Sequence, residues 1–243
     1  MKAYIINLEK ASHRREYMKN VLETMPYLNY EFIQAVDGNR LSDFEKQNIF
    51  DRRKFFNRYL RNPSNGEIGC TLSHQKCYQK VLDGEENYSF IFEDDLIINE
   101  DIKEKIELLR PIYDTNKPVI VLFSGWFWFF NRKNVNGIVL GTVFDGFLAQ
   151  SYIINKAAAK CLYDKQPSIL PDDWKSLRKK GVKIFGVIPH PCEQDWGEGL
   201  GYSIDHSQKV VKGHHLQKIN IILLILQRKF FEFVKHFESC DYL

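Results

Sequence analysis

Short apolar runs alternate with segments of helical periodicity along most of the chain. Residues 3–8 (AYIINL) form the first run, and apolar side chains then recur every three or four positions over residues 17–25. A second run at 30–35 ends in the turn pair Asp37-Gly38. A strand, a helix and a strand in this order predict an α/β domain with a largely parallel sheet.

Later apolar runs predict the remaining strands of this sheet. We expect helices after the break at 62–66, from about residue 100 with Asn99 as cap, and from Pro171 onward. The basic stretch 41–62 predicts either a solvated amphipathic helix or a contact surface for an anionic partner. The expected strands lie at residues 88–92, 119–123, 138–144, 148–154 and 182–188.

The end of the chain differs in character. Apolar residues between Ile219 and Phe237 fall on one side of a helix, and charged residues fall on the other. Such a helix either docks on the domain or lies on a membrane surface, and the pattern leaves both open. We therefore predict a main domain at residues 1–206 and a helical tail at 207–243 that associates with the domain, a membrane or a partner.

Composition narrows the class of protein. A chain of 243 residues with 44% hydrophobic residues suffices for one sizeable domain, and a net charge of +3 is too small for a dedicated nucleic-acid binder. Five cysteines without a CxxC pair argue against a disulfide framework or a zinc site and for a reducing compartment. Without a secretory leader pattern or a bilayer-long apolar run, we expect a cytoplasmic protein.

Three carboxylates, Glu93, Asp94 and Asp95, follow the strand expected at 88–92. Like charges this close repel each other, so either a carboxyl pKa rises or a cation neutralises the cluster. Carboxylate oxygens suit Mg²⁺ or Mn²⁺, and ligands of open α/β sheets bind at the carboxyl ends of strands. The cluster is therefore the first candidate for a metal and phosphate site, although acidic groups also cap helices and line surfaces.

A second acidic site offers a general base. Asp172-Asp173, followed by Trp174, would place a carboxylate beside an aromatic platform, and Glu193 and Asp195 are rival bases. The alternative is a purely structural role, since acidic residues in the first turn of a helix complement the helix dipole.

Basic residues are the remaining candidates. Arg14 and Arg15 follow the first strand and suit a diphosphate, although arginines are common on the surface of a helix. His74 shares a helical stripe with two cysteines, a position more typical of a hydrogen-bonded core histidine than of a metal ligand. His206 is a candidate to complete a metal shell.

Taken together, five segments resemble glycosyltransferase family 25, which includes lipooligosaccharide and procollagen galactosyltransferases. The most specific combination is GEIGCTLSH at 66–74 followed some twenty residues later by FEDD at 92–95. The resemblance covers roughly residues 1–200. The other segments match in the same order: YIINL at 4–8 with Arg14-Arg15, SYIINKAA at 151–158 and PDDW at 171–174.

The resemblance implies a GT-A-like (Rossmann-like) α/β single domain with a mixed, mostly parallel sheet and a C-terminal helical tail. The nucleotide would bind in its first half and the acceptor in its second. It implies a UDP-hexose donor, galactose first and glucose or N-acetylglucosamine as alternatives, a Mn²⁺ or Mg²⁺ cofactor, and inversion at the anomeric carbon. The acceptor would be a lipid-linked lipooligosaccharide or lipopolysaccharide core sugar, reached peripherally on the cytosolic face of a bacterial inner membrane.

The resemblance also implies roles for individual residues. Asp95 is the expected metal ligand, assisted by Glu93 or His206. Asp173 is the expected base, with Asp172, Asp195 and Glu193 as rivals. The expected donor contacts are Asn7, Arg14, Arg15, Ser73, His74, Glu93 and Asp94. The expected acceptor contacts are Trp174, beside Asp173, and Trp126 and Trp128, which belong to an aromatic stretch that departs from the family pattern where the acceptor should bind.

Other classes fit less well. A phosphotransferase with a carboxylate nucleophile would carry it after the first strand, where this chain has Asn7. A nucleotidyltransferase would need a Gly-rich phosphate loop before its carboxylates, and none precedes them. A non-catalytic, membrane-peripheral binding protein would use the basic segment 52–61 and the tail, but it leaves the acidic sites without a role.

Overall fold

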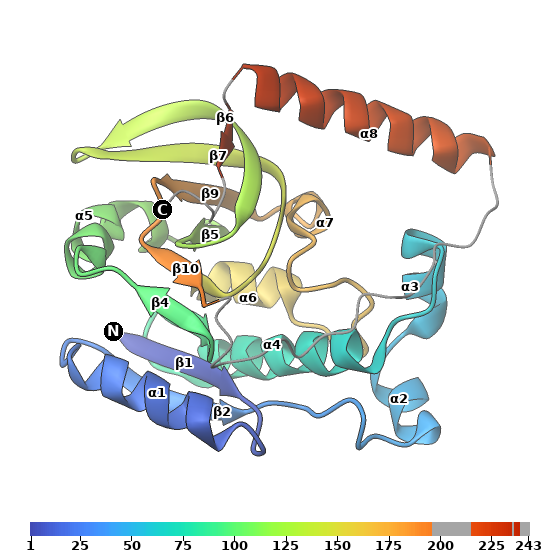
Figure 1. Ribbon diagram of the computed structural model, residues 1–243, viewed down its shortest axis with the longest axis horizontal. Helices are drawn as coiled ribbons and strands as arrows, with labels where there is room; N and C mark the ends of the chain where they lie inside the picture. Colours follow the sequence, from blue (N-terminus) through green and yellow to red (C-terminus); the bar gives the residue numbers. More distant parts are fainter. Residues whose placement is uncertain (196–214, 235, 239–243) are drawn as a thin grey trace.

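The apolar runs of the sequence form the strands of one sheet (Figure 1). A computed structural model describes residues 1–195, 215–234 and 236–238. Within these residues the strand order is β11-β6-β7-β9-β5-β8-β3-β1-β2. The strands are β1 (Lys2–Asn7), β2 (Asn29–Gln34), β3 (Tyr88–Glu93), β5 (Val119–Leu122), β6 (Trp126–Val135), β7 (Ile138–Phe147), β8 (Ser151–Asn155), β9 (Lys183–Ile188) and β11 (Phe237–Glu238).

The sheet is mixed. β1 is parallel to both β2 and β3, and β5 is parallel to β9. β8 runs antiparallel between β3 and β5, and β7 and β11 are antiparallel to their neighbours. Of the nine strands of this sheet, all but these three run in one direction, which confirms the expected α/β fold class.

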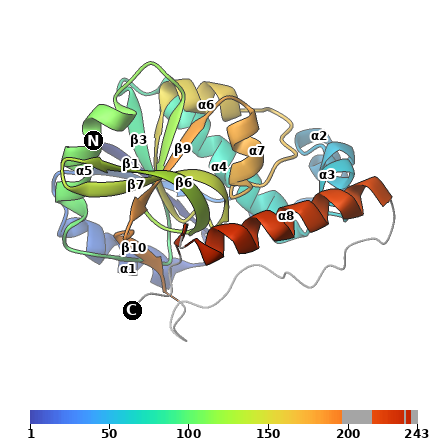
Figure 2. The same ribbon diagram turned by 90° about the horizontal axis from the view of Figure 1, so that it is seen from above.

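Helices cover both faces of the sheet (Figures 1 and 2). On one face, α1 (Ser12–Glu23) and α5 (Ile102–Tyr113) bury Met18, Leu22, Ile106 and Leu109 against the strands. The other face is covered by α4 (Asn65–Asp83), α6 (Lys156–Leu162) and α7 (Trp174–Lys179). These two apolar layers hold the strand ends at fixed positions, because protein interiors are close-packed.

Two local predictions were wrong. The single helix expected at 41–62 is two helices, α2 (Asp43–Ile49) and α3 (Arg52–Tyr59), because Phe50 is extended and Asp51 caps the second helix by accepting from the Lys54 N–H. Residue Asn99 is not a cap either, since α5 begins after Asp101.

The tail helix α8 (His215–Phe233) docks on the β6–β7 hairpin. Arg228 donates to Asp145 at 2.8 Å, the ring of Phe231 lies 5.1 Å from that of Phe144, and Trp128 donates to Glu232 at 3.3 Å. The opposite side of the helix is apolar and exposed. It carries Ile222, Leu223, Ile225, Leu226, Phe230 and Phe233.

One side of α8 therefore docks on the domain, and the apolar side chains of the other side are exposed, so contact with a membrane stays a prediction. Beyond α8, strand β11 pairs with β6 and becomes the edge of the main sheet. The predicted boundary at residues 206–207 lies outside the described residues and stays a prediction. Among the helices described, none is both long enough and apolar enough to cross a membrane.

Candidate functional site

A pocket of about 480 Å³ opens where β1, β2 and β3 end. Its walls come from the loop after β1, the loop after β2, the first turns of α4 and the acidic cluster, so segments far apart in sequence meet there. The lining residues are Ile6, Leu8, Lys10, Ala11, His13, Arg14, Ala35, Val36, Asp37, Gly38, Asn39, Gly66, Cys70, Ser73, Glu93, Asp94 and Asp95.

The segment GEIGCTLSH builds one wall of this pocket. A Cβ added at Gly69 would lie 2.4 Å from the carbonyl oxygen of Val36, so only glycine lets α4 approach the loop after β2. Ser73 fastens the same contact: its hydroxyl accepts from the Val36 N–H at 2.8 Å and donates to the Gly69 carbonyl at 2.7 Å. Ser73, expected as a donor contact, thus positions the loop that lines the pocket.

Asp94 is held by Asn7 and Arg14, two residues that were expected to contact the sugar-nucleotide donor. Asn7 Nδ2 donates to Asp94 Oδ2 at 2.7 Å, and Arg14 Nη1 donates to Asp94 Oδ1 at 2.9 Å. Arg14 is itself buried, and the same Nη1 lies 3.6 Å from Asp95 Oδ2. Burial raises the pKa of Asp94, and these two donors oppose that rise.

Asp95 has the donor chemistry that a hard divalent cation requires. The side chain is buried, its Oδ2 accepts from Gln194 Nε2 at 3.0 Å, and its Oδ1 has no hydrogen-bond partner in the described structure. Burial and the neighbouring Glu93 raise the Asp95 pKa to about 7. A buried carboxylate oxygen without a partner, beside two further carboxyl groups, fits Mg²⁺ or Mn²⁺.

Gln194 was not found by sequence reasoning. It lies on β10 (Cys192–Gln194), which pairs antiparallel with β4 (Leu96–Ile98), directly after the acidic cluster. This pairing is long-range, so no local pattern indicated it. The rival bases Glu193 and Asp195 lie beside Gln194 and are half-buried, and the Asp195 N–H donates to the Asp95 carbonyl at 2.8 Å.

His74 is a core histidine with polar partners on both ring nitrogens. Nδ1 lies 2.7 Å from the hydroxyl of Tyr152, and Nε2 lies 3.2 Å from Oε1 of Glu93. The ring is 1% exposed. His74 therefore connects the helix α4 with the strands β8 and β3 behind the pocket.

The two carboxylates of the second acidic site have different surroundings. Asp173 caps α7 and accepts from four donors: Ser176 N and Oγ, Arg58 Nε, and the Tyr59 hydroxyl. Among the residues that the structure describes, the Asp172 side chain accepts only a long hydrogen bond, from the Leu148 N–H at 3.3 Å. Burial and the nearby charge of Glu93 raise the pKa of Asp172 to about 6. The geometry favours Asp172 over Asp173 as the carboxylate that is available to take a proton.

The structure separates the three candidate tryptophans. Trp174 is 1% exposed and donates to the Leu148 carbonyl at 3.1 Å, so its ring packs in the core and presents no stacking face. Trp128 is buried beneath α8, where Arg228 stacks on it at 4.6 Å. Trp126 is half-buried, and its indole N–H has no partner in the described structure, which leaves it as the best acceptor candidate.

Arg15 does not line the pocket. It is exposed on α1 and lies over the ring of Phe32, 4.2 Å from its centroid. His206 lies outside the described residues.

Further polar atoms without partners gather at the same edge of the sheet. The Glu93 N–H donates to the Gln150 carbonyl, and the Phe123 N–H donates to the Ser151 carbonyl, so the ends of β3 and β5 meet the start of β8. In the described structure the side-chain polar atoms of Gln150 and the hydroxyl groups of Ser124 and Ser151 are buried without partners. Sequence reasoning missed these residues because β8 is antiparallel, which brings the beginning of a strand to this edge.

The fold and the site define an α/β protein with a pocket at the carboxyl ends of parallel strands, beside buried carboxylates, which is where ligands of open α/β sheets bind. The chain belongs to glycosyltransferase family 25: the pattern described as "Glycosyltransferase family 25 (LPS biosynthesis protein)" matches residues 1–174.

Individual relatives agree with this assignment. A putative glycosyltransferase of Haemophilus influenzae is 34% identical over 212 residues, which cover 79% of this chain and 70% of the relative. A glycosyltransferase 25 family member of Aedes aegypti is 28% identical over 68% of this chain, and human procollagen galactosyltransferase 2 is 31% identical over 46%. This chain spans only 28% and 18% of the lengths of those two proteins.

One solved structure, the galactosyltransferase LgtC in complex with donor and acceptor sugar analogues, is similar with a TM-score of 0.38 and 11% identity. The similar region covers 76% of this chain and 73% of the other.

Proposed function

We propose that this protein is an inverting glycosyltransferase that moves a hexose from a UDP-sugar to a hydroxyl group of an acceptor sugar. The observation that carries the proposal is the buried, partnerless Oδ1 of Asp95 on the wall of a pocket of about 480 Å³. Membership of glycosyltransferase family 25 supports the same reaction. The two agree because a sugar nucleotide brings a diphosphate, and a divalent cation is commonly bound by one or two carboxylates together with substrate phosphates.

The acidic cluster would hold the cation and the diphosphate. Asp95, with Glu93 as second ligand, is the residue that would bind Mn²⁺ or Mg²⁺. When bound, such an ion offsets the negative charge that builds on the departing UDP. Asn7 and Arg14 keep Asp94 in place beside it, and Arg14 also contributes positive charge to the donor end of the pocket.

Asp172 would act as the general base. With a pKa of about 6 the carboxylate is ionised at neutral pH and still basic enough to accept the proton of an acceptor hydroxyl. That hydroxyl oxygen then attacks the anomeric carbon from the face opposite UDP, and the bond to UDP breaks. The proton ends on Asp172, and no covalent enzyme intermediate forms.

Galactose is the proposed hexose. The curated relatives include procollagen galactosyltransferases, and glucose and N-acetylglucosamine are the alternatives. The proposed acceptor is a lipooligosaccharide or lipopolysaccharide core sugar, because the family description names LPS biosynthesis. A screen of UDP-sugars against truncated lipooligosaccharide, with the product anomer defined by NMR, tests donor, acceptor and inversion together. A product that retains the donor's anomeric configuration would contradict the inverting mechanism.

UDP release by three variants tests the residue assignments. Asp172→Asn should lose at least ~100-fold in kcat/KM, since general acid–base catalysis typically contributes ~10²–10⁴-fold. Asp95→Asn should lose ~100-fold as well, because the cation that Asp95 would hold stabilises charge in the transition state. Asp173→Asn is the matched control one position away and should stay near wild-type turnover once circular dichroism shows that it is folded. Near-normal turnover in Asp95→Asn or Asp172→Asn would refute that residue's role.

Calorimetry separates the enzyme from a non-catalytic binding protein. UDP should bind to the wild-type chain when Mn²⁺ or Mg²⁺ is present and much more weakly when the cation is chelated. If UDP does not bind under either condition, the chain is not a UDP-sugar enzyme.

The open side of α8 would hold the protein on a membrane that carries the lipid-linked acceptor. We place this surface on the cytosolic face of a bacterial inner membrane. The helix docks through Arg228 and Phe231, so its exposed apolar side chains point away from the domain. Exposed Lys229 adjoins this apolar side, and positive charge favours anionic lipid.

Sedimentation with anionic lipid vesicles tests this placement through a matched pair of variants. Leu226 is 58% exposed, and burying a leucine contributes ~1.5–3 kcal/mol, so Leu226→Glu should weaken vesicle binding by ~10-fold. Gln227→Glu adds the same charge at the neighbouring exposed position and should have a much smaller effect. Equal effects of the two changes would show that the apolar side of α8 does not enter the membrane.

A further inference from the structure

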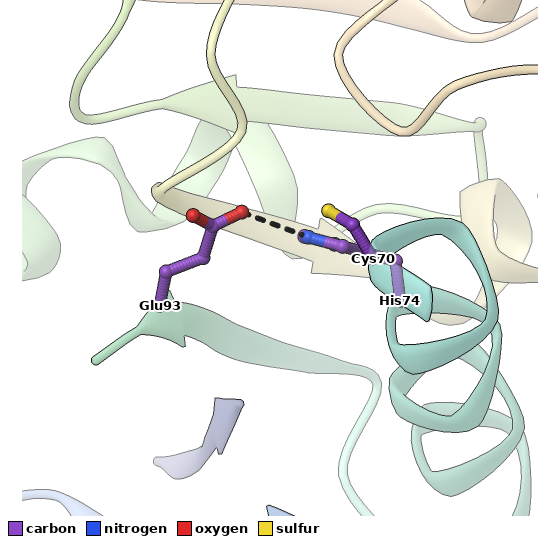
Figure 3. Close-up of side chains that lie close together, drawn as sticks. All are labelled: Cys70, His74 and Glu93. Carbon is purple, nitrogen blue, oxygen red and sulfur yellow. Dashed lines mark hydrogen bonds and ion pairs between the residues drawn. The ribbon is translucent and has the colours of Figure 1, made fainter. Parts of the chain in front are cut away.

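Three potential metal ligands lie together beside Asp94 and Asp95. The proposed reaction gives no chemical role to two of them, Cys70 and His74. The three ligands are Cys70, His74 and Glu93 (Figure 3). Cys70 and Glu93 line the pocket, and His74 lies one layer deeper. The sulfur, one imidazole nitrogen and one carboxylate oxygen are all within 4.8 Å of one another.

The backbone fixes this arrangement. Cys70 and His74 are four residues apart on α4, so their side chains project from the same side of the helix. Glu93 is the last residue of β3 and meets them from the sheet, with its Oε1 3.2 Å from His74 Nε2. Figure 3 shows the thiol and the imidazole side by side, with the carboxylate opposite them.

The second ring nitrogen of His74 is already held. Its Nδ1 lies 2.7 Å from the Tyr152 hydroxyl, which is in turn 3.3 Å from the hydroxyl of Tyr78. The rings of His74 and Tyr152 are also stacked, at an angle of 13°. Metal-binding histidines commonly have this support, because a hydrogen bond at one nitrogen orients the other toward the ion.

We infer that Cys70, His74 and Glu93 form a binding site for Zn²⁺, which adjoins the carboxylate site for a harder cation at Asp95 and shares Glu93 with it. Sulfur and imidazole ligands select Zn²⁺ over Mg²⁺ or Mn²⁺, which take oxygen ligands. Tetrahedral Zn²⁺ with bonds of ~2.0–2.3 Å keeps its ligand atoms roughly 3.5 Å apart, so side-chain movements of about 1 Å complete the site. Three protein ligands leave the fourth position for water or a group in the pocket.

The cysteine spacing had argued against a zinc site. That argument fails here because the ligands come from one helix and the end of a strand, and no CxxC pair is required.

Cobalt absorption tests the site directly. Co²⁺ replaces Zn²⁺ in such sites, and a cysteine thiolate bound to Co²⁺ gives a near-ultraviolet charge-transfer band. The full chain should develop this band on titration with Co²⁺ and lose it when Zn²⁺ is added, whereas Mg²⁺ should have no effect. Cys70→Ser should abolish the band, and Cys161→Ser, which changes a half-buried thiol on α6, should retain it.

Affinity measurements extend the test to the other two ligands. Changes in second-shell partners cost ~10–100-fold in metal affinity, so Tyr152→Phe should weaken Zn²⁺ binding by ~10-fold. Loss of a direct ligand in Glu93→Gln should weaken it by ~100-fold or more. Unchanged Zn²⁺ affinity in Glu93→Gln, with a folded protein, would overturn the site.

Protection from alkylation tests the site in the unaltered chain, so the outcome does not depend on any variant folding. Zn²⁺ should slow iodoacetamide labelling of Cys70, measured by peptide mass spectrometry, and leave labelling of Cys161 unchanged. Equal labelling of Cys70 with and without Zn²⁺ would overturn the inference. None of these measurements needs a sugar donor, so a failure here leaves the proposed glycosyl transfer untouched, and a failure of glycosyl transfer leaves this site untouched.

Discussion

Replacing Arg14 by methionine removes the buried positive charge between Asp94 and Asp95. Arg14 is 7% exposed, and its Nη1 lies 2.9 Å from Asp94 Oδ1, so methionine leaves a buried carboxylate without its charged partner. Breaking such a pair costs ~3–5 kcal/mol. Proton uptake by Asp94 limits the loss, because a neutral carboxyl group can be buried with Asn7 as its remaining partner.

The free-energy cost of protonating Asp94 depends on pH, so the loss of stability can be measured at two pH values. An ordinary aspartate has a pKa of ~3.9, so protonating it costs at most about 4 kcal/mol at pH 7 and about 1.5 kcal/mol at pH 5. The folded variant then holds a proton that its unfolded form lacks, so its stability falls as the pH rises. Urea unfolding of Arg14→Met should therefore show a clearly larger loss at pH 7 than at pH 5.

The control is Arg110→Met, which removes an exposed arginine paired with Asp114 on the surface of α5 and should leave the free energy of unfolding unchanged. An equal loss for Arg14→Met at both pH values, or no loss at all, would refute the electrostatic account of the acidic cluster.

Three further outcomes are expected. Because Asp172 must be ionised to act as base, kcat/KM should fall about tenfold per pH unit below pH ~6, and Asp172→Asn should lack this dependence. Gly69→Ala should lower the free energy of unfolding by ~1–3 kcal/mol in a urea titration, since its Cβ meets the backbone oxygen of Val36 at 2.4 Å; an unchanged midpoint would contradict the close approach. Arg228→Met leaves buried Asp145 without its cation, so amide hydrogens of α8 should exchange at least ~10-fold faster, while unaltered exchange would show that other contacts hold the helix.

Local patterns predicted those parts of the fold that depend on local sequence. The apolar runs at 3–8 and 88–92 correctly predicted β1 and β3. Both strands are buried on both faces of the sheet, and such strands have continuous apolar sequences. The acidic cluster was found for the same reason, since it follows directly from the end of such a run.

Long-range pairing limited the prediction of the site. Gln194 and Asp95 are 99 positions apart in the sequence, and the pairing of β10 with β4 brings their side chains together. Local reasoning could not compare the surroundings of Asp172 and Asp173 either, and the choice of base stays a prediction. Arg58 and Tyr59 donate to Asp173 from α3, more than a hundred residues earlier in the chain.

The antiparallel strand β8 has a consequence for how changes in the β6–β7 hairpin reach the site. Gln150 and Ser151 stand at the start of β8, immediately after the β6–β7 hairpin, whereas the carboxylates stand at the end of β3. A change in the length of the hairpin would therefore act along the chain on the buried polar groups of Gln150 and Ser151. It would also reach the acidic cluster, because the Glu93 N–H donates to the Gln150 carbonyl. The β6–β7 hairpin and the end of β3 are thus coupled at one edge of the sheet, so an altered hairpin is expected to change the position of the carboxylates as well as that of Gln150 and Ser151.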